Sequence, residues 1–514
     1  MASFSVLARN ALSNWAVFAA NIVATLILSP IVVRELGTSQ YGIWLFITAV
    51  TGYLGLIEGG VTVSTGRFLN YHIGRNDPGA ARATVSTALA FYVAVAGILL
   101  LAVGAFSEPI SQLATPELGL DGRTLLLVVL LQTANVGGTF IAAVFAQLLH
   151  AENRFDLKNG ALLLGLVFRF IATLWVFKAG GGLYDLAWVQ LLGTLLTLSA
   201  LAGLSHRFGP RLGLSRHAVS RPALAEIFGF GKWAFANNIA SRIDGQSGVI
   251  ITGVFFNARA VAHFGVAQML VEYGTQLVQN IVAVAVPDLT KSAGRGDKDA
   301  IGRFVTTAAR VTAFFGVPLL IGAALLGPAF VTLWMGAEFA EASTVMLVLA
   351  VAKSCFVLAT PLGMGIWATG RVRALTASSL LTAIGGILLS VLALRLGGFG
   401  YEAVAAGTLA TAMAQWLLVQ TWIGLHMLKL SVGWFLVRVV WPYVTTAVMF
   451  ALVAVAVMRL LPHRSWPEFI VLVSVVMLVY LPIAAILLWG ARRSADAIAG
   501  AWLQATKSWN KRLP

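Results

Sequence analysis

The stretch YGIWLFITAVTGYLGLIEGGVTVSTGRFLNYHIGRND, from Tyr41 to Asp77, holds the strongest indication of the fold. After its Tyr-Gly turn, it continues for about 25 mostly apolar residues, enough for a helix to cross a bilayer at about 1.5 Å per residue. Glu58 lies inside this run. A carboxylate at that depth is costly if it faces lipid, so we expect Glu58 to face protein or water.

The composition of the whole chain supports a membrane protein. Of the 514 residues, 59% are hydrophobic and 11% are charged, far from the averages of soluble domains. The net charge of +15 comes from basic residues in short connections between apolar runs, which indicates membrane topology and not a nucleic-acid partner. The single cysteine, Cys355, excludes a disulfide framework and a cysteine metal site.

Apolar runs of membrane-spanning length predict an all-α polytopic protein with about 14 transmembrane helices. We place the spans near residues 12–33, 41–65, 84–106, 124–149, 160–179, 184–204, 228–256, 261–287, 304–326, 343–367, 375–396, 402–427, 435–458 and 468–490.

The distribution of Lys and Arg predicts the orientation. Most of the 35 basic residues fall in the N-terminal segment, the even-numbered loops and the C-terminal tail. The odd-numbered loops hold only Arg34, Arg123, Lys178, Arg259, Arg395, Arg459 and Arg464. This bias places both termini in the cytoplasm, and we expect a bacterial inner-membrane protein.

Four short echoes at nearly constant offset indicate an internal duplication. Tyr41-Gly42 is echoed by Phe264-Gly265, and three further pairs follow the same offset. Six spans in each copy give the copies the same membrane orientation, related by an axis along the membrane normal. The predicted divisions are an N-lobe at 1–205, a cytoplasmic linker at 206–227, a C-lobe at 228–428, and two extra spans with a cytoplasmic tail at 429–514.

The Tyr41–Asp77 pattern resembles the second-helix signature of the Wzx-like polysaccharide flippases, in the multidrug/oligosaccharidyl-lipid/polysaccharide (MOP) exporter superfamily. That signature has a Tyr-Gly entry, an acidic residue before Gly and a basic residue after it; here Glu58 stands for the usual Asp. The resemblance implies a two-lobed, V-shaped transporter with a central cavity.

One-sided polar stripes on spans one, two, seven and eight also predict a central cavity. We expect the deep cations to bind a diphosphate, amides to bind sugar, acids to couple an ion or proton, and loop arginines to line the cytoplasmic entry. The diphosphate candidates are Arg242, Arg169, Lys353 and Arg310. The sugar candidates are Asn14, Asn21, Asn237, Asn238, Gln246, Gln268 and Gln276. The coupling candidates are Glu58, Asp244 and Glu272, and the entry candidates are Arg67 and Arg75. Each polar residue has an alternative role in hydrogen bonding or ion pairing between helices.

The predicted function is the flipping of a polyprenyl-diphosphate-linked oligosaccharide for surface polysaccharide assembly, by alternating access coupled to H⁺ or Na⁺, with no resident cofactor or metal. The predicted protein is a monomer among membrane lipids, with a polysaccharide polymerase and glycosyltransferases as further partners. The transport alternatives are a lipid II flippase and a multidrug exporter of the same superfamily. A membrane polymerase or acyltransferase is the enzyme alternative, which the short outer loops and the lack of an intramembrane His disfavour.

Overall fold

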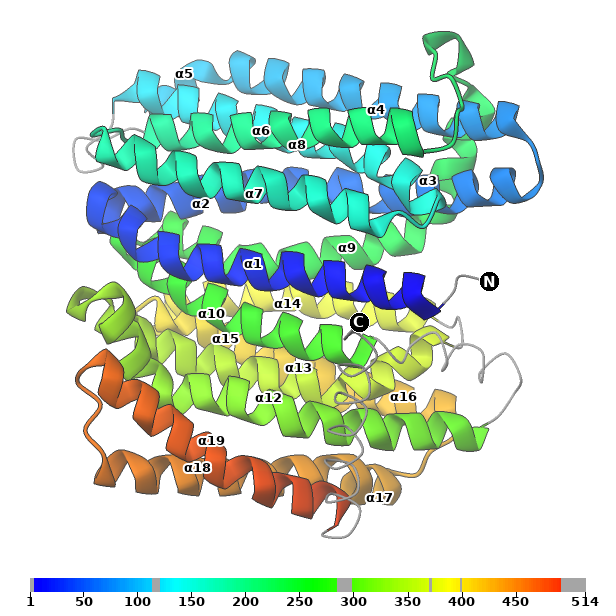
Figure 1. Ribbon diagram of the computed structural model, residues 1–514. Coiled ribbons are helices and arrows are strands. Elements are labelled where there is room, and N and C mark those ends of the chain that lie inside the picture. Colours follow the sequence, from blue (N-terminus) through cyan, green and yellow to red (C-terminus); the bar gives the residue numbers. More distant parts are fainter. Residues whose placement is uncertain (1–3, 113–120, 284–297, 369–371, 398–399, 491–514) are drawn as a thin grey trace, which may run out of the picture. The chain divides into compact units, whose positions relative to one another are not determined.

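The computed structural model describes residues 4–112, 121–283, 298–368, 372–397 and 400–490 (Figure 1). Its regular secondary structure in these ranges is entirely helical, which confirms the all-α prediction. The chain divides into two compact units, Met1–Gly265 and Val266–Pro514. Two segments that belong to the predicted sequence echoes, Gly294–Asp297 and Gly370-Arg371, lie outside the described residues. The tail of the 429–514 segment also lies outside them.

The first unit contains long helices joined by short turns (Figure 1). They are α1 (Phe4–Leu36), α2 (Thr38–Leu54), α3 (Leu56–Gly74), α4 (Pro78–Ala105), the short α5 (Ser107–Gln112), α6 (Gly122–Ala151), α7 (Phe155–Lys178), α8 (Leu183–Phe208), the 3₁₀ turn η2 (Arg216–Ala218) and α9 (Arg221–Phe255).

The second unit begins within α10 (Ala258–Ala283). It continues with α12 (Lys298–Met335), η3 (Ala337–Glu341), α13 (Ala342–Ala368), α14 (Val372–Gly397), α15 (Glu402–Ala412), η4 (Met413–Val419), α16 (Gln420–Leu428), α17 (Val432–Phe435), η5 (Leu436–Val440), α18 (Trp441–Leu460) and α19 (Trp466–Trp489). The π-helical turns η4 and η5 continue their flanking helices without a break.

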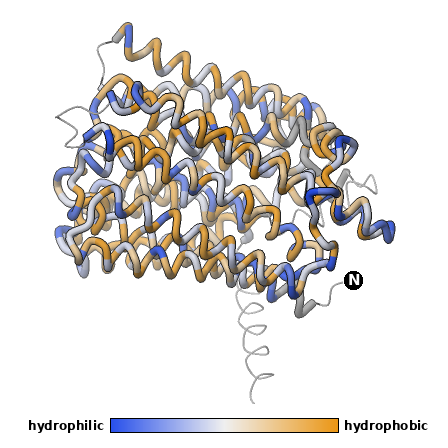
Figure 2. The backbone as a smooth tube through the Cα atoms, turned by 90° about the horizontal axis from the view of Figure 1, so that it is seen from above, coloured by the Kyte–Doolittle hydropathy of each residue, from blue (hydrophilic) through white to orange (hydrophobic). Residues whose placement is uncertain are grey.

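Eleven helical segments of the described residues are long and apolar enough to cross a membrane, which makes this chain a multi-pass membrane protein. Figure 2 shows hydrophobic residues along the helices and hydrophilic ones gathered toward their ends. The other three predicted spans are also helical, as α2–α3, α9 and α10. These three are not among the helices that are both long and apolar enough to count as spans, so the number of 14 spans stays a prediction.

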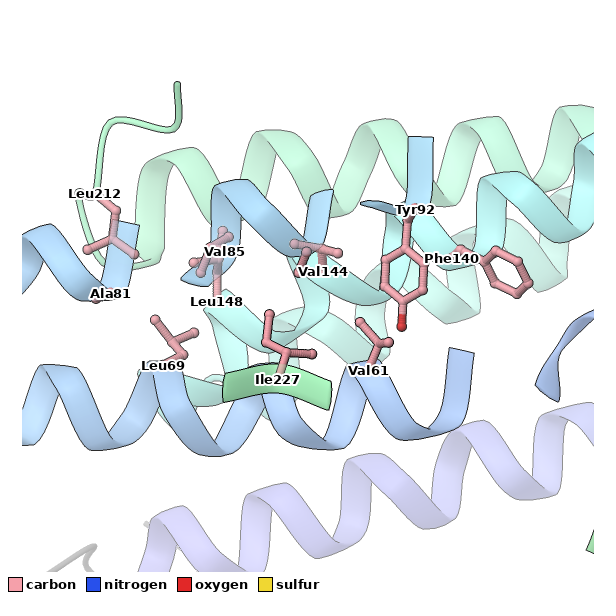
Figure 3. Close-up of a cluster of buried hydrophobic side chains, with 11 residues drawn as sticks. Val61, Leu69, Ala81, Val85, Tyr92, Phe140, Val144, Leu148, Leu212 and Ile227 are labelled. Carbon is pink, nitrogen blue, oxygen red and sulfur yellow. The ribbon is translucent and has the colours of Figure 1, made fainter. Parts of the chain in front are cut away.

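A buried hydrophobic cluster joins α3, α4 and α6 to the chain that precedes and begins α9 (Figure 3). Tyr92 and Phe140 are its largest side chains, and both are fully buried. Leu212, from the segment between α8 and α9, and Ile227, from the first turns of α9, pack into the same cluster. The start of α9 therefore belongs to the core of the first unit.

Three hydrogen bonds fasten the segment between α8 and α9 to α4. Arg82 Nε donates to the carbonyl of Leu212 (2.6 Å), and the amides of Ser215 and Ser220 donate to the hydroxyls of Ser86 (3.3 Å) and Thr87 (3.0 Å). We call this segment, residues 209–220, the strap. The predicted linker at 206–227 thus includes a pinned segment, and the two compact units divide later, after Gly265.

The sequence Ser220-Arg221-Pro222 begins helix α9. The Ser220 hydroxyl accepts a hydrogen bond from the amide of Ala223 (3.2 Å), and the helix begins at Arg221 with Pro222 in its first turn. Proline suits this position because its missing N–H would have no intrahelical acceptor there.

In the second unit, α18 and α19 pack on α12 (Figure 1). The Tyr480 side chain of α19 is fully buried and donates its hydroxyl toward the carbonyls of Ala313 (3.2 Å) and Phe314 (3.4 Å). Pro318 of α12 has no N–H to bond the carbonyl four residues earlier, which is that of Phe314. Tyr480 therefore supplies the donor that Pro318 lacks.

Candidate functional site

The predicted second span is two helices, broken at Gly55. The α2 helix ends at Leu54 and α3 begins at Leu56, with the Gly55 amide bonded to the carbonyl of Gly52 (3.1 Å) in a tight turn. Glu58 lies in the first turn of α3, directly after the break. The break thus lies next to the carboxylate that the sequence places at membrane depth.

Helix α9 packs antiparallel along α2 and α3, and glycines permit the close approach. A Cβ on Gly52 would lie 3.5 Å from the Gln246 amide carbon, and one on Gly55 would lie 3.3 Å from Nη2 of Arg242. Small residues at such contacts are typical of membrane helix pairs. We call this contact the α3–α9 seam, which also includes the pairs Gly60–Phe235 and His72–Glu226.

Gly42 shows how tight the approach is at the end of α9. A Cβ on Gly42 would overlap the backbone carbonyl of Ala258, the first residue of α10. Only glycine fits there without moving the backbone. The Tyr-Gly entry of the signature therefore has a packing reason at its second residue.

Arg242 and Glu58 lie close to the same helix break on the two sides of the α3–α9 seam. The half-buried Arg242 side chain reaches the Gly55 turn, and the half-buried Glu58 lies in the first turn of α3, directly after it. In the described part of the chain, no ion pair within 4.0 Å joins the two. Gln246 lies one helical turn from Arg242 along the same seam, whereas Asp244 is exposed.

Tyr92 of α4 holds the backbone beside Glu58 in place. Its hydroxyl donates to the Glu58 carbonyl (2.8 Å) and lies 2.8 Å from the Thr62 hydroxyl. Since a phenol has one proton, the Thr62 hydroxyl donates the second bond. Tyr92 is also part of the cluster in Figure 3, so the core fixes the first turn of α3.

A second cation and carboxylate meet in the second unit. Lys353 Nζ of α13 lies 3.6 Å from Glu272 Oε2 of α10, and Gln276 donates to the other Glu272 oxygen (3.3 Å). The Lys353 ammonium also lies 5.9 Å from the centre of the Phe356 ring. Three of the predicted site residues thus come together here.

Arg169 belongs to a separate polar group among α6, α7 and α8. Its Nη2 donates to the Thr194 hydroxyl (2.8 Å), which in turn donates to Asn135. The Arg169 chain lies over Gly193, where a Cβ would meet it at 2.6 Å from Nε. Among the described residues, the buried Nε has no hydrogen-bond acceptor.

The amides predicted to bind sugar divide into several environments. Asn14 accepts a hydrogen bond from the buried Asn159 (2.7 Å), which joins α1 to α7, and Asn21 donates to its own helix at Val17 (2.9 Å). Four other predicted residues are half-buried: Asn237 and Asn238 on α9, Gln268 on α10 and Arg310 on α12.

The two predicted entry residues are exposed: Arg67 lies in the C-terminal half of α3, and Arg75 directly follows its last residue, Gly74. Arg75 donates to the Tyr71 hydroxyl (3.0 Å), and its guanidinium lies 5.6 Å from the centre of that ring. Arg67 lies 5.8 Å from the centre of the Phe68 ring. Both cations are therefore presented next to aromatic faces.

Sequence reasoning missed three groups that shape these sites. Tyr92 gave no sequence signal because a tyrosine in an apolar run does not reveal its partner. The Asn135–Thr194 pair and the buried Asn159 lie outside the four spans with a polar stripe. Asn135 and Thr194 are polar residues inside apolar runs, which is a detectable signal, whereas Asn159 lies just before the predicted span at 160–179.

Taken together, the half-buried charges and the helical architecture define a multi-pass membrane protein with polar groups between its helices. Two of the solved structures with a similar fold illustrate it. One is lipid II flippase MurJ in an inward closed conformation (TM-score 0.72, 15% identity, 93% of this chain and 98% of that one). Another is an inward-facing multidrug resistance MATE family transporter of the MOP superfamily (TM-score 0.68, 15% identity, 79% of this chain and 94% of that one). These likenesses show the fold alone.

The family follows from the sequence comparison. The polysaccharide biosynthesis protein family model matches residues 31–344, more than half of the chain, so the chain belongs to this family. Two relatives are from Bacillus subtilis (strain 168). The uncharacterized membrane protein EpsK is 22% identical over 88% of this chain and 91% of its own length. The teichuronic acid biosynthesis protein TuaB is 24% identical over 44% and 46%. Family and fold agree with the resemblance to Wzx-like proteins of the MOP superfamily.

Proposed function

We propose that this protein flips a polyprenyl-diphosphate-linked oligosaccharide across a bacterial inner membrane, for the assembly of a surface polysaccharide. The observation that carries the proposal is the family match over residues 31–344 on a chain with the fold of MOP transporters. The matched region includes Glu58, Arg242 and Glu272, which the span prediction places at membrane depth. Such charges are costly in lipid and are typical of substrate and ion pathways.

Each class of polar side chain has a proposed task. Arg242, Lys353 and Arg310 bind the diphosphate, because guanidinium and ammonium groups form charge-assisted bonds to phosphate oxygens. The amides of Asn237, Asn238, Gln246, Gln268 and Gln276, with Asn14 and Asn21, bind sugar hydroxyls. Glu58, Asp244 and Glu272 couple transport to H⁺ or Na⁺, and Arg67 and Arg75 receive the substrate at the cytoplasmic surface.

Arg169 has a weaker case among the diphosphate candidates. A phosphate would have to displace its bond to Thr194, and its chain is packed on Gly193. A matched pair of substitutions separates the two roles. Arg169→Lys and Arg242→Lys both keep the charge; we expect the first to lower thermal stability and the second to weaken diphosphate binding.

The proposed orientation has both termini in the cytoplasm, and the protein acts as a transporter by alternating access with no chemical step of its own. Its proposed partners are the glycosyltransferases and the polymerase that make and extend the repeat unit. Accessibility of single cysteines placed in the N-terminal segment, in a Cys355→Ser background, tests the orientation.

Reconstitution tests the function directly. Purified full-length protein in proteoliposomes receives a fluorescent diphospholipid oligosaccharide, and a membrane-impermeant quencher reports the fraction on the inner leaflet. We expect the wild-type protein to flip the labelled lipid and the Arg242→Ala variant to lose this activity. Flipping equal to that of empty vesicles, with correctly folded protein, would contradict the proposal.

One alternative substrate has a specific observation in its favour. The structural match to lipid II flippase MurJ covers 93% of this chain. Competition between lipid II and a diphospholipid oligosaccharide in the same vesicles distinguishes the two substrates, because both have a diphosphate and they differ in the sugar headgroup.

A further inference from the structure

Arg242 occupies an unusual position. Its side chain lies at the Gly55 helix break, near Glu58, but forms no ion pair with that carboxylate in the described part of the chain. Its Nη2 lies against the Gly55 turn, where no side chain intervenes. Glu58 is the acid nearest to this turn along the chain, in the first turn of α3. In the part of the chain that the structure describes, the two are not within ion-pair distance of 4.0 Å.

A tight pair in the same unit provides the contrast. Arg154 donates through Nε (3.1 Å) and Nη2 (3.2 Å) to the two oxygens of Asp156, a two-bond fork. Arg9 lies 3.7 Å from the same carboxylate. Arginine and carboxylate form such a fork readily when geometry permits. Glu58 and Arg242 instead lie near the same helix break without a fork, and among the described residues the guanidinium donors of Arg242 are left for another anion.

We infer that Glu58 is an internal counter-anion for Arg242, and that a substrate diphosphate displaces it. The inference rests on the proposed function and deepens it, because it names the group that regulates the affinity of Arg242. Before substrate enters, Glu58 balances the Arg242 charge in the helix bundle. When a diphosphate binds, its oxygens take the guanidinium donors, and the carboxylate turns away or takes up a cation.

The backbone around Glu58 suits an exchange of this kind. Tyr92 and Thr62 hold the Glu58 carbonyl and the first turn of α3, while neither bond involves the carboxylate. The side chain can therefore move without unwinding the helix. The glycine at position 55 leaves the approach to Arg242 free of a side chain on that side.

The exchange predicts that removing the Glu58 charge strengthens diphosphate binding. The probe is a fluorescent polyprenyl diphosphate without sugar, titrated against the full chain in nanodiscs of zwitterionic lipid. We expect Glu58→Gln to bind it about tenfold more tightly than the wild type, within the range of about 5–150-fold usual for coupled sites. Arg242→Gln should lose binding, and the double variant should equal Arg242→Gln.

Two further variants keep the test decisive. Asp156→Asn neutralises a carboxylate paired elsewhere in the unit, and its affinity should match that of the wild type. Glu58→Asp shortens the acid and weakens the attraction, so it should tighten binding in the same direction but less. If Glu58→Gln does not fold, Glu58→Asp alone tests the inference. Unchanged or weaker binding in the folded variants overturns it.

The phosphate source and the proposed function are tested separately. Phosphatidylglycerol is titrated as a competitor, and an equal gain for it in Glu58→Gln would overturn the diphosphate assignment in favour of a general lipid-phosphate site. Flipping of the sugar-bearing lipid by the wild type is measured in parallel. If the wild type flips the lipid but Glu58→Gln does not bind the diphosphate more tightly, only the exchange is refuted. If Glu58→Gln binds the diphosphate more tightly but the wild type does not flip the lipid, only the proposed function is refuted.

Discussion

The Tyr480 hydroxyl lies 3.4 Å from the carbonyl of Phe314, the acceptor that Pro318 leaves without a helical donor. This contact ties α19 to α12, a helix of the second predicted repeat. We expect Tyr480→Phe to lower the free energy of unfolding of the second unit by about 1–3 kcal/mol, because a buried carbonyl loses its donor. Pro318→Ala restores an N–H to α12, so in that background Tyr480→Phe should cost less. An equal cost in both backgrounds, measured as thermal unfolding in detergent, would show that the proline is irrelevant.

Tyr92 and Thr62 should act as one unit. Tyr92→Phe removes the donor to the Glu58 carbonyl, and Thr62→Val removes the second partner while keeping the shape. Each change should cost about 1 kcal/mol, and the double variant should cost less than the two together, since they share the same phenol. Strict additivity of the three melting shifts would argue that the two hydroxyls do not interact.

Gly42 should tolerate no side chain. A Cβ there overlaps the Ala258 carbonyl, so Gly42→Ala must move backbone against backbone. We expect a loss of about 1–3 kcal/mol, typical of overpacking. The control is Gly97→Ala in α4, where the added Cβ meets nothing within 4 Å and the helix gains propensity. Similar melting temperatures for the two variants would contradict the close approach.

The two polar pairs at helix ends in the first unit should differ in strength. Glu226 is 37% exposed and meets His72 through one contact of 3.3 Å, whereas Asp156 is 24% exposed and accepts a two-bond fork from Arg154. Glu226→Gln should therefore cost less than about 1 kcal/mol, and Asp156→Asn should cost more. The reverse order in thermal unfolding would show that the described geometry does not set the energies.

The proposed alternating access requires the α3–α9 seam to part, because α3 falls in the predicted N-lobe and α9 in the predicted C-lobe. Gly60→Cys with Phe235→Cys places two Cβ atoms close together, in a Cys355→Ser background. We expect oxidation to stop flipping and a reductant to restore it.

A matched cross-link controls for the chemistry. Ala96→Cys with Gly137→Cys joins α4 to α6 at a similar Cβ separation, inside one predicted lobe. Flipping should survive this second bond. If the oxidised seam variant also flips normally, then α9 moves together with α2 and α3, as the compact first unit would allow.

The sequence predicted the helices well because apolar runs of membrane length have few other solutions. The sequence Ser-Arg-Pro at 220–222 is typical of a helix start, and Ser220 caps α9. The contact of Glu272 with Lys353 agrees with the alternative role of ion pairing between helices, which avoids the cost of a deep charge in lipid. The sequence did not predict the break at Gly55, since glycine is tolerated within membrane helices. The pairing of Arg169 with Thr194 and the approach of Arg242 to the Gly55 turn depend on helix packing, which no single span specifies.

The strap has a practical consequence for anyone labelling this protein. The segment around Leu212 and Ser215 lies between two helices and resembles a flexible linker in the sequence. A reporter domain inserted there would nevertheless break hydrogen bonds to α4 and pull an apolar side chain out of the core. The turn at Gly180, which is exposed and carries no such anchors in its described surroundings, is the safer place for an epitope or a fluorescent tag.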